Sequence, residues 1–139
     1  MSNAKTYIDG GTATATLAAG DIVTKNSAGA VSKVAAASST TAIGVVYSGV
    51  SSSTGGKAVS YSVSGKAKVY AGVATNGTAI EVGTPLVIGT GSTRGAGQVL
   101  VAAASDADAT TIVGKALEAV ALNTTTAQET LIDAEVDFQ

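Results

Sequence analysis

An order of short motifs that occurs twice constrains the fold more than any other feature of this sequence. Three pairs of segments correspond: 20–23 with 83–87, 29–38 with 97–105, and 40–46 with 110–116. Each copy predicts a strand, a turn, a second strand, an alanine-rich connection and a strand that contains a glycine. Because repeat arrays usually need three or more units, two copies predict one domain built from similar halves, 20–65 and 83–138.

The residue pattern within each half is typical of strands. The chain has 17 Val against 6 Leu and is rich in Ser, Thr and Gly, which favours pleated strands over helices. Side chains alternate at 58–64 and again at 130–138, where Ile132, Ala134, Val136 and Phe138 are predicted to face inward. We therefore expect an all-β fold, a small sandwich or barrel-like domain.

The boundaries follow from the same reading. A length of 139 residues fits one domain, or at most two very small ones. Residues 1–19 are expected to form an extended N-terminal arm and a first strand, and residues 20–139 a single β domain. Gly65 is expected to end one strand before another begins at Lys66. Residues 111–117 are predicted as a strand, with a helical turn near 105–109.

Composition removes several classes of function. The chain has no Cys and no His, which excludes disulfides, thiolate or imidazole metal ligands and a Ser-His-Asp triad. The net charge is −2, the eight basic residues are scattered, and there is no Trp, so we expect no nucleic-acid partner. No apolar run is long enough for a membrane helix, and we expect neither a membrane nor a small-molecule substrate as partner.

Acidic residues are the remaining candidates for chemistry. Asp106 with Asp108, or the alternating Asp133, Glu135 and Asp137, could ligate a hard cation, and paired carboxylates could serve a glycosidase. Alternating acids are also the pattern of a solvated strand face, and sugar sites usually contain more aromatic residues. We expect no catalytic residue, no cofactor and no metal.

The glycine-rich stretch 89–97, GTGSTRGAG, could cradle a phosphate or form a hairpin tip. A phosphate-binding loop continues into Lys-Ser/Thr and a helix. Here strand-like runs lie on both sides, so the sequence predicts a hairpin with Arg94 at its exposed tip.

The glycines and strands together resemble a known family. The segments 20–23, 42–46, 56–65, 83–87 and 112–117 resemble the capsid cement, or head decoration, proteins of tailed bacteriophages. The resemblance extends from about Gly20 to Phe138. The resemblance implies a β domain on the outer surface of the virion capsid. It also implies a homotrimer that clamps subunits of the major capsid protein and stabilises the expanded head.

Contact residues follow from this interpretation. An arm at residues 4–13 could add a strand to a neighbouring subunit, because strand addition relies on main-chain hydrogen bonds. We expect Tyr7 and Ile8, and also Arg94, to make intersubunit or capsid contacts. The alternative is a phage tail or fibre component, or a bacterial surface β module that binds a glycan or a host protein. An enzyme, with the acidic residues as its only candidates, is a third possibility.

Overall fold

The computed structural model describes residues 7–13, 15–36, 41–48, 58–75, 77–104, 111–122 and 125–138. Within these ranges the chain forms strands and no α-helix, which confirms the all-β prediction. The strands are β1 (Tyr7–Ala13), β2 (Ile22–Lys25), β3 (Ala30–Lys33), β4 (Gly44–Ser48), β5 (Ala58–Val73), β6 (Pro85–Thr90), β7 (Ala96–Ala102), β8 (Ile112–Ala116) and β9 (Gln128–Asp137). β8 confirms the strand predicted at 111–117, whereas the helical turn predicted at 105–109 lies outside the described residues.

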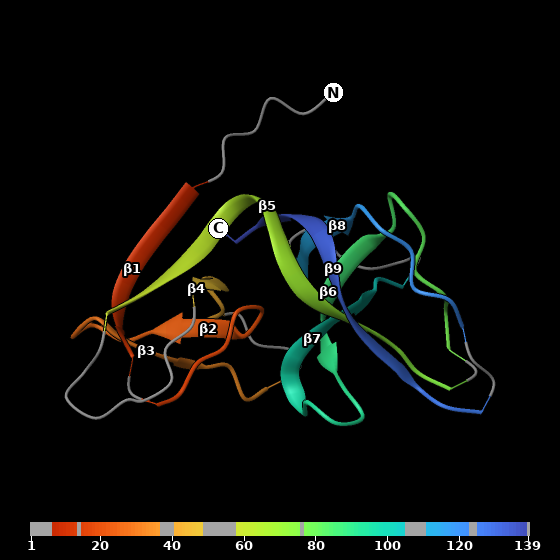
Figure 1. Ribbon diagram of the computed structural model, residues 1–139, viewed down its shortest axis with the longest axis horizontal. Coiled ribbons are helices and arrows are strands. Elements are labelled where there is room, and N and C mark those ends of the chain that lie inside the picture. The colour runs from red at the N-terminus through yellow and green to blue at the C-terminus, as the bar shows by residue number, and fades with distance from the viewer. Residues whose placement is uncertain are drawn as a thin grey trace.

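The strands close into two barrels that share β5. The order β1-β3-β2-β4-β5 returns to β1, and the order β5-β7-β6-β8-β9 returns to β5. β1 pairs with the first part of β5, from Ala58 to Ser64, and β9 pairs with the part from Ser64 to Val73. Figure 1 shows β5 running from the N-terminal barrel, red and orange, to the C-terminal barrel, green and blue. The prediction that Gly65 ends a strand is wrong, because Gly65 adopts a φ of +96° and the strand continues through it.

The two barrels use the same strand pairings, and the β2–β4 and β6–β8 ladders share a register. β2 meets β4 at Val23 and Gly44, and β6 meets β8 at Leu86 and Gly114. Main-chain hydrogen bonds repeat as well: the Gly20 amide donates to Val46 O at 3.0 Å, and the Gly83 amide donates to Ala116 O at 2.8 Å. The segments that begin at Gly20 and Gly83 therefore occupy equivalent positions opposite the strands that contain Gly44 and Gly114.

The glycines at equivalent positions in β4 and β8 allow a close approach of strands. A Cβ on Gly44 would lie 2.6 Å from Ser62 O, and one on Gly114 would lie 2.9 Å from Glu135 O. Ser62 and Glu135 lie on β5 and β9, the strands beside β4 and β8. A side chain at either glycine would push these neighbouring strands apart.

Each barrel has its own core, and the C-terminal core extends across the contact between the barrels. The N-terminal core comprises Ala13, Leu17, Val23, Val31, Val46, Val59 and Tyr61. Ile22 and Val45 are neighbours of core residues Val23 and Val46, so they point to the opposite, outer face of the barrel. Both are fully buried and belong to the cluster of the C-terminal barrel. Apolar packing therefore joins the barrels.

The predicted inward face of the last strand is confirmed. Ile132, Ala134, Val136 and Phe138 are at most 4% exposed. Phe138 also donates its main-chain amide to Val63 O at 2.9 Å, which fixes the end of β9 beside β5.

The expectation of an arm that reaches a neighbour with residues 4–13 is corrected for its described part. Residues 7–13 form β1 and pair with β5 of the same chain, at positions from Tyr7 opposite Ser64 to Thr12 opposite Ala58. The main-chain groups that make these bonds are engaged within the N-terminal barrel.

Candidate interaction surfaces and the 89–97 loop

The glycine-rich stretch is a hairpin tip, as predicted. β6 and β7 pair in antiparallel register on either side of it, and the Gly91 amide donates to Gly95 O at 3.1 Å. Gly95 and Gly97 have φ angles of +88° and +80°, which side chains other than glycine rarely adopt. No helix follows, so the loop lacks the frame of a phosphate-binding motif.

The amides of this tip nevertheless bind an anion, and the anion belongs to the chain. Main-chain amides of Ser92, Thr93 and Arg94 donate to the carboxylate of Glu129, the last two at 2.8 and 3.1 Å. The hydroxyls of Ser92 and Thr93 also donate to it, at 2.5 and 2.9 Å. Desolvation raises the pKa of Glu129, but these hydrogen bonds outweigh it and lower the pKa to about 2, so the group is ionised near neutral pH.

Glu129 approaches the loop closely because residue 91 is glycine. A Cβ on Gly91 would lie 3.0 Å from the carboxylate carbon and from Oε1. Consecutive amides that converge on one anion form a nest. Here Glu129, at the start of β9, occupies it.

The expectation that Arg94 lies at an exposed tip is wrong. Its side chain is 22% exposed and forms an ion pair with Asp21 of the N-terminal barrel, whose side chain is 1% exposed. The guanidinium carbon lies 3.8 Å from the centre of the Tyr70 ring, and Nε donates to Gln98 O at 3.3 Å. Arg94 therefore joins the two barrels, while its expected contact with a capsid subunit stays a prediction.

Gln98 makes a second polar connection between the barrels. Its side chain is buried; Oε1 accepts from the Ile22 amide at 3.2 Å, and Nε2 donates to Ile22 O at 2.9 Å and Val34 O at 2.6 Å. Asp21 lies next to Ile22 and accepts from the Ala18 amide at 2.8 Å, with Lys33 Nζ 3.8 Å away. These bonds satisfy the polar groups that the contact buries.

Asp21, Gln98 and Glu129 were not singled out as site residues by the sequence. Gln98 offered a weak signal, since it precedes the apolar run 99–103. Asp21 and Glu129 offered none, because their partners lie 73 and 35 to 37 residues away in the chain.

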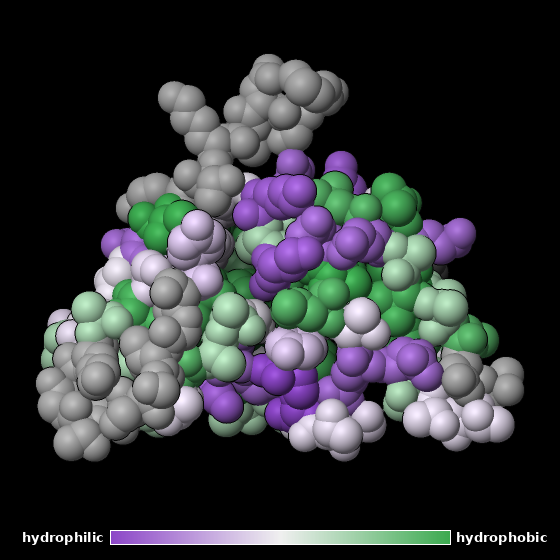
Figure 2. All heavy atoms as spheres, in the orientation of Figure 1, coloured by the Kyte–Doolittle hydropathy of each residue, from purple (hydrophilic) through white to green (hydrophobic). Residues whose placement is uncertain are grey.

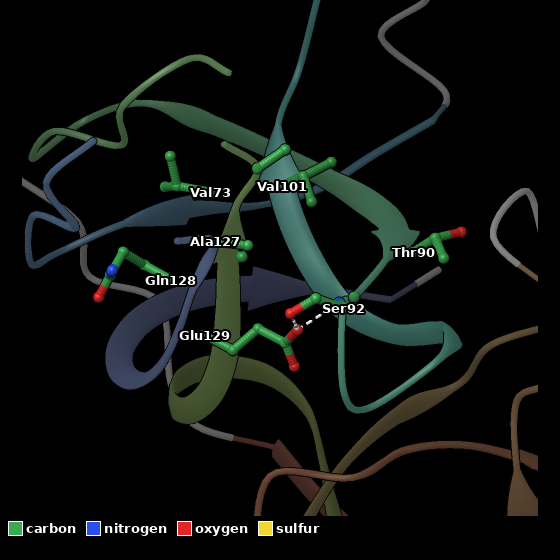
Figure 3. Close-up of a pocket in the computed structure, with 10 residues that line it drawn as sticks. Val73, Thr90, Ser92, Val101, Ala127, Gln128 and Glu129 are labelled. Carbon is green, nitrogen blue, oxygen red and sulfur yellow. Dashed lines mark hydrogen bonds between the residues drawn. The ribbon is translucent and has the colours of Figure 1, made fainter. Parts of the chain in front are cut away.

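A small pocket lies beside the occupied nest. It has a volume of about 220 Å³ and an apolar side formed by Gly72, Val73 and Val101. Figure 3 shows the Glu129 carboxylate turned toward Ser92 and Gln128 turned away from it. The volume is below the roughly 300–1,000 Å³ of ordinary ligand pockets, and the carboxylate already accepts hydrogen bonds from the loop. The pocket suits a single side chain better than a substrate.

The outer face of β5 and β9 carries charges of both signs. Lys68 Nζ lies 2.9 Å and Lys66 Nζ 3.5 Å from the Asp133 carboxylate. The hydrogen bond from Lys68 lowers the pKa of Asp133, and the same bond raises the pKa of Lys68. Figure 2 shows hydrophilic side chains gathered in the upper middle of the view, over β5 and β9. Asp133 thus pairs with two lysines of the neighbouring strand β5.

Two further findings concern the part of the chain that the structure describes. It contains no cluster of three or more acidic side chains placed to hold a metal ion. It also contains no helix with the length and apolar character needed to cross a membrane. Asp106 and Asp108 lie outside the described residues.

Large apolar side chains remain exposed on both barrels. Tyr47, 62% exposed, follows Val46 in β4, where the ladder with β5 is irregular. Ile8 on β1 is 41% exposed. Among the described residues, the other large apolar side chains that are exposed are Val82, Leu117, Leu122 and Leu131. Of the expected contact residues, Ile8 is thus exposed, whereas the structure does not describe the side chain of Tyr7. No described contact joins Ile8 to Arg94.

Comparison with known proteins gives a structural neighbour. No protein-family model and no curated protein matches this sequence. Among solved structures, the chain is similar to the N base of the head fiber protein gp8.5 of bacteriophage phi29. The TM-score is 0.56, the identity is 16%, and the likeness covers 96% of each chain. The two chains share a fold.

Proposed function

We propose that this chain is a structural, non-enzymatic protein of a tailed-phage head, which binds the outer capsid surface and cements the expanded shell as a trimer. The observation that carries the proposal is the fold shared with the phi29 head fiber base over 96% of both chains. The resemblance in sequence to head decoration proteins points independently to the same part of a virion. The partner is the major capsid protein.

The physical properties of the chain support a binding role. Its described acidic side chains pair with lysines or with main-chain amides at several positions, as Asp133 and Glu129 do. Exposed apolar side chains such as Ile8 and Tyr47 provide area that a shell can bury. Many copies, each bound weakly, stabilise a lattice through avidity.

A second candidate is the base of a fibre attached to the head. The name of the phi29 protein favours it, because that chain is itself a fibre base. A cement protein covers the shell in a fixed ratio to the major capsid protein, whereas a fibre base anchors a projecting domain. The tail-component and bacterial-surface alternatives predict no binding to heads.

Co-sedimentation with phage heads that lack the protein separates these candidates. The purified chain is added over a concentration series, bound copies are counted per head, and the heat resistance of the heads is measured. Saturation at a fixed ratio to the major capsid protein, with more heat-resistant heads, is the expected result. Saturable binding without a gain in heat resistance favours the fibre base, and absence of binding contradicts both.

Contact residues are best tested with point variants. Deleting residues 2–11 would remove most of β1 and its pairing with β5, so lost binding would only report a damaged barrel. Ile8→Ser and Tyr47→Ser change exposed side chains instead. We expect each to weaken head binding by about tenfold, or roughly 1.4 kcal/mol. Leu122→Ser changes a 42% exposed side chain on the other barrel; normal binding by this variant would assign the contact to the N-terminal barrel.

A further inference from the structure

We propose that the 89–97 loop is a latch between the two barrels, in which Glu129 is a positioning residue that holds Arg94 against Asp21. The latch links β9 of the C-terminal barrel to the start of β2 in the N-terminal barrel. Glu129 and Asp21 bind different parts of Arg94, its main-chain amide and its guanidinium. This inference does not depend on the proposed role at a phage head.

Hydrogen bonds to one carboxylate set the conformation of the loop tip. Three consecutive amides, from Ser92 to Arg94, point to one carboxylate, and two hydroxyls join them. Amides in such a nest repel one another unless an anion sits between them. The shape of the tip therefore depends on Glu129, which lies on a different strand.

The position of the Arg94 side chain depends on the same hydrogen bonds to Glu129. With its amide bound by Glu129, the residue sends its guanidinium over the Tyr70 ring and onto Asp21. The planar guanidinium has to be aimed correctly to stack and pair at once. Without its hydrogen bonds to Glu129, the tip would no longer hold the Arg94 guanidinium in the orientation that contacts Tyr70 and Asp21.

Asp21 requires a positively charged partner because its carboxylate is buried. Its carboxylate is 1% exposed, and a buried charge is strongly destabilising without a close partner. The other cation near it, Lys33, is 3.8 Å away and half exposed. Arg94 is therefore the main counter-charge for Asp21, and loosening the tip weakens the contact between the barrels.

Chemical rescue tests the nest. Glu129→Ala removes the carboxylate and leaves the amides free to take formate. We expect Glu129→Ala to lower the urea midpoint of unfolding, and sodium formate to restore part of the loss where sodium chloride at equal ionic strength does not. Glu118→Ala is the control, because Glu118 accepts one amide, that of Asp133, and builds no nest. No loss of midpoint in Glu129→Ala, or equal effects of formate on both variants, would overturn the proposal.

A double-mutant cycle tests the relay. Asp21→Asn is combined with Glu129→Ala, and with Glu129→Gln where the alanine variant does not fold. If Glu129 acts through Arg94, Asp21→Asn lowers the midpoint less in the Glu129 variant than in the wild type. Purely additive losses would mean that the nest and the ion pair are independent, and the latch would be refuted.

Discussion

The Gln98 side chain offers the sharpest test of how the barrels are held together. Replacing it with Leu puts an apolar side chain of similar size at a 5% exposed position and removes every hydrogen bond of the amide. Ile22 O keeps a partner, since it also accepts from the Val34 amide at 2.9 Å. The Ile22 amide and Val34 O lose theirs.

The expected cost follows from these two groups. A buried polar group without a partner costs about 1–3 kcal/mol. Burial of a Leu side chain in place of an amide offsets part of the sum, so we expect Gln98→Leu to destabilise the protein by about 2–4 kcal/mol. That loss is a large share of the roughly 5–15 kcal/mol by which a domain is stable.

Equilibrium unfolding in urea measures this cost, with the free energy extrapolated to water. Gln128→Leu is the matched control, because its amide only donates to Thr126 O at 3.2 Å near the surface. We expect a change of about 0.5 kcal/mol or less for the control. A Gln98→Leu variant that loses no more than Gln128→Leu would refute the reasoning that this amide joins the barrels.

Three further outcomes are expected. The pKa of Glu129 is 4.5 in the unfolded chain and about 2 in the folded protein, so the carboxylate stabilises the fold fully above pH 4.5 and loses this effect as the pH falls toward 2. The difference in unfolding free energy between the wild type and Glu129→Gln, measured by urea unfolding at each pH, should therefore narrow from pH 4.5 to pH 2. Gly44→Ala should cost about 1–3 kcal/mol in urea unfolding, since its Cβ would meet Ser62 O at 2.6 Å, whereas Gly72→Ala, with no atom nearer than 3.4 Å, should cost less. Phe138→Ala should lower stability by about 3–5 kcal/mol by leaving a cavity, and a thermal melt unchanged by it would contradict the burial of this ring.

Local pattern predicted the strands because their physical cause is local. The alternation at 130–138 follows from one buried face, and Ile132 and Val136 are buried accordingly. The hairpin at 89–97 was predicted from the strand-like runs beside it. Gly65 misled the prediction, because a glycine with positive φ bends a strand as readily as it ends one.

Contacts between distant segments could not be predicted in this way. The exposure of Arg94 depends on Asp21, which lies 73 residues earlier in the chain. A loop rich in glycine indicated only that side chains there are small, while the carboxylate that fills its nest comes from β9. Whether the chain forms a sandwich or barrels depends on the pairing of β5 with strands of both halves. The sequence pattern of a single segment does not predict that pairing.

The repeated barrels differ where one of them has to meet the other. Ile22 pairs with Val45 in the N-terminal barrel, and both side chains are buried against the C-terminal barrel. The equivalent pair in the C-terminal barrel is Pro85 with Lys115, and both residues are exposed. An apolar outer face needs a partner, and a face that ends in lysine stays in water. The same ladder thus yields one barrel that requires a neighbour and one that does not, which explains why two repeats suffice for a closed unit.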